Sequence, residues 1–326
     1  MKKIWIGIGI AVILALLSGC GGGGGGPGVT PPQAGDVARL FPLTQGQTLT
    51  YDGSETQHAY MKITGAFTLG LAKRKLQAGP LSLDIPLPKF SPLKRAETHT
   101  YESIRDETNT GTDINTIIGT HTGDPFPANI TAAIEETHGQ GNWNSHEVEK
   151  MDGSVVSDQT YSGNWEDWTR DFYTNENGEV KMWGWQEKVN SDWGPIQAYP
   201  EPWLLFKAGE TSWKVAHIEE DVENAVFSAD LMANLVAKET ITVPAGTFTC
   251  YKVVYKYTNV KLETPPQNVQ VTSWNLSSTI TVWLALDKGI VKSENKTTLT
   301  ASFKDLESGR TGSISMSSTS TSSLKQ

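Results

Sequence analysis

The chain has 326 residues, with 27 Lys and Arg against 36 Asp and Glu, which gives a formal net charge of −9 at pH 7. This acidic balance argues against a nucleic-acid partner, because phosphate binding requires clustered Lys and Arg. Only two cysteines are present, and one of them, Cys20, directly follows the predicted leader, which leaves Cys250 alone, so we expect no disulfide bond. The length is sufficient for one large domain or two smaller ones with a core of their own.

Residues 1–19 are predicted to be a signal peptide. Lys2 and Lys3 precede an apolar run over residues 4–17 that is too short for an ordinary membrane span. The run ends in Leu17-Ser18-Gly19-Cys20, which resembles the lipobox of bacterial lipoproteins. The resemblance implies cleavage before Cys20 and lipidation of Cys20; an uncleaved or conventionally cleaved signal is the alternative. Gly21 after the cysteine, where an aspartate would favour retention, implies the outer membrane rather than the inner one.

Residues 20–38 are predicted to combine the lipidated Cys20 with a flexible tether. Six glycines at positions 21–26 are followed by prolines at positions 27, 31 and 32. Such a composition buries too little apolar surface to order itself.

Residues 39–312 are predicted to form a single large β domain. Apolar and polar residues alternate in runs that are separated by turn signals, at residues 152–153, 174–178, 244–246 and 287–289. Beyond the leader no segment has a long helical period, and the best helix candidate, residues 231–236, is short. We therefore expect an all-β, mainly antiparallel fold: a curved sheet, half-barrel or barrel-like, with irregular insertions.

Three stretches fit this pattern less well. Residues 62–161 are a possible insertion, within which a Gly/Thr/Asn-rich loop separates weak strands at 98–106 and 130–137. Residues 73–92 contain four prolines, which a central strand would not tolerate, and are predicted to be irregular. The Ser/Thr-rich residues 313–326 are predicted to be either a frayed tail or an edge strand.

The sequence contains no recognisable catalytic motif, so we do not expect an enzyme. The nucleophile elbow, the zinc-protease helix and the phosphate-binding glycine loop are all missing. Six histidines are scattered along the chain, which gives no metal site, and nothing indicates a cofactor. Cys250 is predicted to be a small buried apolar residue.

Tryptophans crowd into the middle of the chain and supply the candidate ligand-binding residues. These are Trp165, Trp168, Trp183 and Trp185. Carboxylates at Glu166, Asp167 and Asp171 lie beside them, a combination that suits glycan binding or glycosidase chemistry. Strand alternation places Trp165 and Asp167 on one face, and Glu166 and Trp168 on the other. Aromatic cross-strand packing beside solvated charges is the alternative interpretation.

Four motifs together resemble a family of uncharacterised bacterial exported lipoproteins. They are FPL at 41–43, PWLL at 202–205 with GETSW at 209–213, VPAGTF at 243–248 with Cys250, and VWLA at 282–285 with GIVK at 289–292. The resemblance implies an antiparallel β domain, similar to the curved half-barrel of periplasmic lipoprotein carriers. It supplies no catalytic residue.

The sequence thus predicts a non-enzymatic, lipid-anchored protein of the bacterial cell envelope, facing the periplasm or the surface. We expect it to bind an apolar ligand or a protein partner in or on a curved β-sheet. The expected partners are the membrane, through the N-terminal lipid, and a lipid, glycan or envelope protein. The alternative is a surface glycan-binding or glycan-active protein that uses the Trp/Asp/Glu-rich segment 165–187.

Overall fold

The computed structural model describes residues 29–66, 98–222, 225–263, 269–306 and 309–325. The predicted signal peptide, Cys20, the glycine tract and the proline-rich stretch 73–92 lie outside these ranges. Within them, no helix is long and apolar enough to cross a membrane.

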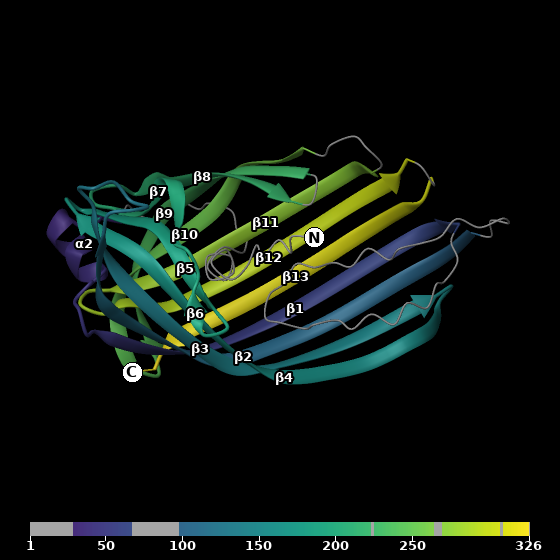
Figure 1. Ribbon diagram of the computed structural model, residues 1–326, viewed down its shortest axis with the longest axis horizontal. Coiled ribbons are helices and arrows are strands. Elements are labelled where there is room, and N and C mark those ends of the chain that lie inside the picture. Colours follow the sequence, from purple (N-terminus) through teal and green to yellow (C-terminus); the bar gives the residue numbers. More distant parts are fainter. Residues whose placement is uncertain (1–28, 67–97, 223–224, 264–268, 307–308, 326) are drawn as a thin grey trace.

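The described residues form one short helix and a single sheet of thirteen strands (Figure 1). The elements are α2 (Ala34–Leu40), β1 (Thr48–Ala66), β2 (Thr98–Thr122), β3 (Thr131–Met151), β4 (Ser154–Glu176), β5 (Glu179–Val189), β6 (Asp192–Trp193), β7 (Gln197–Lys207), β8 (Ser212–Val222), β9 (Ala225–Val243), β10 (Gly246–Glu263), β11 (Val269–Ala285), β12 (Gly289–Asp305) and β13 (Thr311–Leu324). All neighbouring strands pair antiparallel, and the sheet is curved but not closed. The predicted all-β, curved antiparallel fold is therefore confirmed.

The strand order shows how the two halves of the chain join. Along the sheet the order is β6-β5-β4-β3-β2-β1-β13-β12-β11-β10-β9-β8, and β7 pairs with β5. The described part of residues 62–161 belongs to this same sheet. The Ser/Thr-rich C-terminal stretch, which the sequence suggested as a tail or edge strand, is the interior strand β13 between β1 and β12.

The predicted hairpin turns are present where the sequence placed them. Asp152 and Gly153 have φ values of 50° and 80° between β3 and β4, and Asn177 and Gly178 have 53° and 79° between β4 and β5. Consecutive residues with positive φ match the right-handed twist of the flanking strands, which is why Asn-Gly and Asp-Gly mark hairpins so well.

Two segments differ from expectation. Strand β2 continues to Thr122 through the stretch that the sequence suggested as a loop, because β1 and β3 pair with it on both sides. Residues 34–38, which we assigned to the tether, begin helix α2. Val37 and Leu40 lie three positions apart on one face of this helix, and both are fully buried in the main core.

The main core lies at the end of the molecule that carries α2 (Figure 1). There, side chains of β5 and β7 pack against those of β8 to β11. Two hydrogen bonds connect these parts of the curved sheet: Trp213 Nε1 donates to the Leu204 carbonyl and Tyr255 Oη donates to the Leu205 carbonyl, each at 2.9 Å. This end of the concave face is thereby covered.

A second cluster surrounds the VPAGTF turn. Gly246 pairs with Val243 across a two-residue loop and has a φ of 133°. Cys250 is fully buried nearby, packed with Trp283, Val291 and other apolar side chains. Burial raises the pKa of its thiol to about 11. Along β10 the alternation is unbroken, and Tyr251, Val253 and Tyr255 are buried on the opposite face, in the main core. The register shift between β9 and β10 leaves Val236 of β9 without a partner residue on β10.

We predict that Gly246→Val destabilises the domain more than Cys250→Ala. A β-branched side chain at the φ of Gly246 costs roughly 1–3 kcal/mol in backbone strain. Replacing Cys250 removes one sulfur atom and breaks no disulfide, at a cost of about 1 kcal/mol. Chemical denaturation midpoints of the two variants check the order. A larger loss for Cys250→Ala would show that this thiol has a role beyond packing.

Candidate ligand-binding cavity

The concave face of the sheet encloses a cavity of about 370 Å³ beside the main core. This volume lies within the range of small-molecule sites, about 300–1,000 Å³. One wall is apolar and comes from β5, β7 and β9 to β11. Its side chains include Met182, Leu205, Leu231, Tyr255, Ile280 and Val282.

The opposite wall is acidic and comes from β1 to β4. Its carboxylates are Glu55, Asp113, Glu135, Asp167 and Asp171. Among the described lining residues the single basic side chain is Lys288, in the turn between β11 and β12. The cavity is therefore two-sided, with hydrocarbon facing a surface of carboxyl groups.

Strand register explains why these carboxylates gather. Asp113 of β2 pairs with Gly139 of β3, which pairs with Asp167 of β4. Four residues along β4, Asp171 pairs with Glu135. Because side chains on one face of a strand recur every second residue, both acidic rows point into the concavity.

Trp165 lies on the same face, in a row of glycines. Gly53, Gly111 and Gly141 are paired in succession across β1 to β3, and Gly141 pairs with Trp165. A Cβ atom on Gly111 would lie 2.4 Å from the indole ring, and one on Gly141 would lie 2.8 Å from it. Glycine at these positions therefore lets the indole lie flat against the sheet.

The indole and two carboxylates meet above Gly139. A Cβ atom placed there would be 2.3 Å from Asp167 Oδ1, 2.8 Å from the Trp165 ring and 2.9 Å from Asp113 Oδ1. The two carboxylates are thus close neighbours beside an aromatic ring. We call Trp165, Asp113 and Asp167 the indole–carboxylate site.

Burial raises the pKa of every carboxyl group on this wall. Removal from water, with Asp167 close by, raises the pKa of Asp113 to about 6. Burial, followed by the charge of Glu135, raises the pKa of Asp171 to about 8. The pKa values of Glu55, Glu135 and Asp167 are raised as well, with burial as the largest cause in each. Ionised carboxylates lose their hydration here, and the charge of His138, which acts on Asp167, only partly offsets this loss.

Part of the acidic wall is held by hydrogen bonds. Asn115 Nδ2 donates to Glu135 at 2.5 Å, and Ser318 Oγ donates to Glu55 at 2.8 Å. These contacts fix the side chains from neighbouring strands, so the wall is built into the sheet rather than into a loop.

A DUF3108-like family model matches residues 215–301. This segment runs from β8 into β12 and includes the VPAGTF turn, so it supplies part of the apolar wall and none of the acidic one. The matched part covers two of the motif groups on which the resemblance to exported lipoproteins was based.

The sequence and fold were also compared with solved structures and with curated proteins. A crystal structure of a presumed exported protein with a YmcC-like fold, from Bacteroides fragilis, aligns over 91% of this chain and 97% of that chain. The sequence identity over this alignment is 13% and the TM-score is 0.22. No curated protein matches the sequence significantly.

The four tryptophans suggested by the sequence do not form one site. Trp165 lines the cavity, whereas Trp168 stacks on His138 with ring centroids 3.8 Å apart. Trp183 Nε1 donates to Thr174 Oγ1, and Trp185 packs against the main core. Glu166 contacts His138 on the same side as Trp168, so the predicted division of β4 into two faces is confirmed.

Sequence reasoning missed Asp113, Glu135 and Glu55. Each lies on a strand other than β4, and Asp113 lies in the stretch that the sequence suggested as a loop. The available signal was a spacing of two, with Gly111 and Asp113 in one stretch and Gly139 and Gly141 in the next. Cross-strand register was needed to bring them beside Trp165.

We predict that Asp171→Asn makes stability less dependent on pH. In the folded protein Asp171 keeps its proton up to about pH 8, whereas in the unfolded chain it loses it near its ordinary pKa. The folded state therefore binds more protons across this window, and its stability falls as pH rises. Between pH 5 and pH 8 the variant should lose at least about 1 kcal/mol less than the parent protein.

Denaturant midpoints at the two pH values measure this difference. Asp192→Asn, at an exposed position on β6, is the matched control and should behave like the parent. Equal losses in the parent and in Asp171→Asn would show that the carboxyl group of Asp171 does not titrate differently on folding.

Proposed function

We propose that this protein is a lipid-anchored binding protein of the bacterial cell envelope, which holds the apolar part of a ligand in the concavity of its sheet. The observation that supports this proposal is the apolar wall of a cavity of about 370 Å³. Leu231, Tyr255 and Ile280 line it from strands that are rigidly paired on both sides. Burial of apolar ligand surface against such side chains is favourable by roughly 25 cal/mol per Å².

The anchoring part of the proposal rests on the sequence before residue 29. A lipobox-like Leu17-Ser18-Gly19-Cys20, followed by glycines, supports attachment through Cys20. Under this proposal the domain faces the periplasm or the cell surface, and the outer membrane is favoured.

A second candidate function is glycan binding. It is favoured by the indole–carboxylate site, since a flat indole beside carboxylates suits a sugar ring. Trp165 reaches the site on its own, however, because Trp168, Trp183 and Trp185 lie elsewhere. The other three candidate tryptophans of segment 165–187 therefore do not add to this site.

We predict that the protein binds N-phenylnaphthylamine, an uncharged apolar dye, and that Ser293→Trp weakens binding at least tenfold. Ser293 lines the cavity from β12, so an indole there occupies the space without removing an apolar side chain. The protein used is the chain from residue 20 onward with Cys20→Ala, which contains every described residue.

Ser162→Trp is the matched control, because Ser162 is exposed on β4 and does not line the cavity. Dye fluorescence gives the affinity, and circular dichroism confirms that both variants are folded. An unchanged affinity in Ser293→Trp, or no dye binding by the parent, would overturn the proposal. Affinity for sugars alone would favour the second candidate.

We predict that Cys20→Ala in the full chain abolishes membrane association and leaves the fold intact. Cys20 lies outside the described residues that form the sheet, and under the proposal its replacement removes the lipid. Cell fractionation measures the location, and mass spectrometry of the N-terminus determines whether the leader was removed. A processed variant that stays firmly in the membrane fraction would contradict lipid anchoring through Cys20.

A further inference from the structure

The acidic wall disfavours binding of an anionic ligand head group. Five carboxylates line it, and the arginines nearest in register are engaged with other acids: Arg105 with Glu107, and Arg170 with Glu136. An anionic group would meet like charge in a partly buried space. A positively charged group would meet compensating charge without displacing an existing salt bridge.

Buried polar atoms without partners lie on the same wall. Thr169 is 2% exposed, and its Oγ1 makes no hydrogen bond. It lies between Asp167 and Asp171 on the inward face of β4 and pairs with Thr137, which lines the cavity. Trp165 Nε1 and Asn115 Oδ1 are buried without a partner as well. Such groups cost about 1–3 kcal/mol each when they find no partner, so a polar group of a bound molecule or a water at this wall is stabilised by pairing with them.

The indole–carboxylate site narrows the chemistry of such a bound group. Two carboxylate oxygens and the Trp165 ring lie within 3 Å of one point above Gly139. An ammonium group is attracted both by carboxylates and by the face of an indole. Among the described residues no three His, Cys, Asp or Glu side chains are placed to hold a metal ion, so an organic cation fits better than a metal.

We infer that the ligand is a cationic amphiphile, whose amine or quaternary ammonium group binds at the indole–carboxylate site while its hydrocarbon part lies against Leu231, Tyr255 and Ile280. The inference rests on the proposed function, because the apolar part of the ligand occupies the same cavity. Both walls line one cavity, so a single molecule with a charged end and an apolar end can contact both.

The raised pKa values of the wall agree with this occupant. Without a cation, Asp113 and Asp171 hold protons at higher pH than usual because they are buried without a basic partner. A bound ammonium group favours the ionised carboxylates and so lowers these pKa values.

The experiment compares three ligands that share one twelve-carbon chain, each below its micelle concentration: dodecyltrimethylammonium, dodecyl maltoside and dodecanoate. Displacement of the naphthylamine dye from the soluble Cys20→Ala chain gives each affinity. We expect the cation to bind at least tenfold more tightly than the other two. The ranking uses the parent protein, so it does not depend on whether any cavity variant folds.

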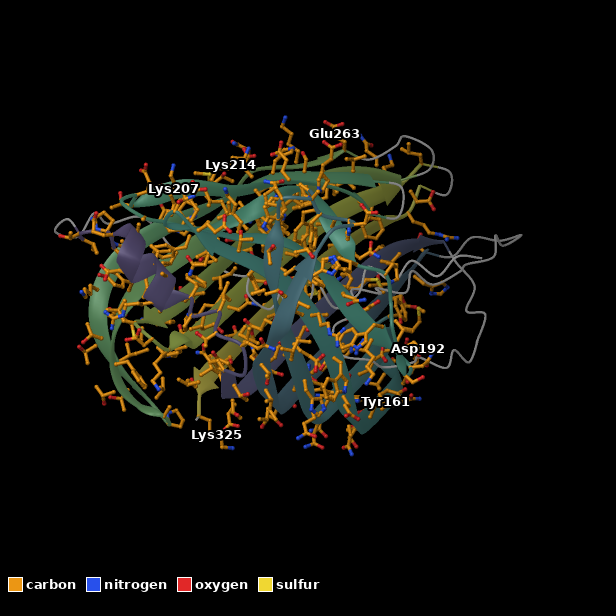
Figure 2. The ribbon with its side chains drawn as sticks, turned by 60° about the vertical axis from the view of Figure 1, so that its left-hand side comes forward. Tyr161, Asp192, Lys207, Lys214, Glu263 and Lys325 are labelled. Atoms are coloured by element: carbon orange, nitrogen blue, oxygen red, sulfur yellow. The ribbon has the colours of Figure 1, made fainter. Side chains whose placement is uncertain are left out.

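Two pairs of substitutions distinguish the effect of the indole–carboxylate site on affinity from the effect of the net negative charge of the chain. Asp113→Asn with Asp167→Asn should lower the affinity for dodecyltrimethylammonium to that for dodecyl maltoside. The matched control is Asp158→Asn with Asp192→Asn, which changes the net charge equally at exposed positions. Figure 2 shows Asp192 at the periphery of the molecule. The control should keep the preference for the cation.

Each alternative outcome is decisive. Equal affinities for all three head groups leave the proposed function standing and overturn the cationic ligand. Preference for the maltoside overturns the cation in favour of a sugar. A loss of cation preference in the control pair equal to that in the site pair shows a non-specific charge effect and overturns the site. If neither the dye nor any of the three ligands binds, the proposed function fails together with this inference.

Discussion

The cavity depends on the contact between β7 and the strands at the opposite end of the sheet. Trp213 and Tyr255 donate hydrogen bonds to the consecutive carbonyls of Leu204 and Leu205 in β7, and Phe206, the next residue, is fully buried. These contacts keep an open antiparallel sheet bent around a concave face. They are not part of a backbone ladder between β7 and these strands. The sheet is therefore not closed, although one end of its concave face is covered.

Helix α2 completes that covered end. The Arg39 guanidinium forms a bidentate contact with Asp287, and Asn175 Nδ2 donates to the Phe41 carbonyl at 2.9 Å. The helix therefore connects the β11–β12 turn with the β4–β5 turn. The exposed ion pair adds little stability by itself, whereas burial of Val37 and Leu40 contributes the larger share.

Local signals predicted most of the fold and only part of the site. Asp152-Gly153 and Asn177-Gly178 determine turn geometry within two residues, so the hairpins were visible in the sequence. Residues 107–122 were not recognisable as a strand, because the Gly, Asn and Asp residues interspersed in it have weak strand preferences and its conformation depends on pairing with β1 and β3. The face on which Trp165 lies was predictable from strand alternation. The glycines against which its indole packs, and Asp113, lie on other strands and are brought there by long-range strand register.

The position of β13 has a consequence for how the domain forms. Strand β13 lies between β1 and β12, and in the described sheet it is the strand whose backbone pairing joins β1–β7 to β8–β12. Strands β1–β7 and strands β8–β12 can each pair with their sequence neighbours as the chain is synthesised. The pairing that joins these two sets requires β13. As the chain emerges from its N-terminal end, the strand pairings across this junction cannot form until residues 311–324 are available. A chain interrupted before residue 311 would present two open strand edges, those of β1 and β12, to other proteins in the same compartment.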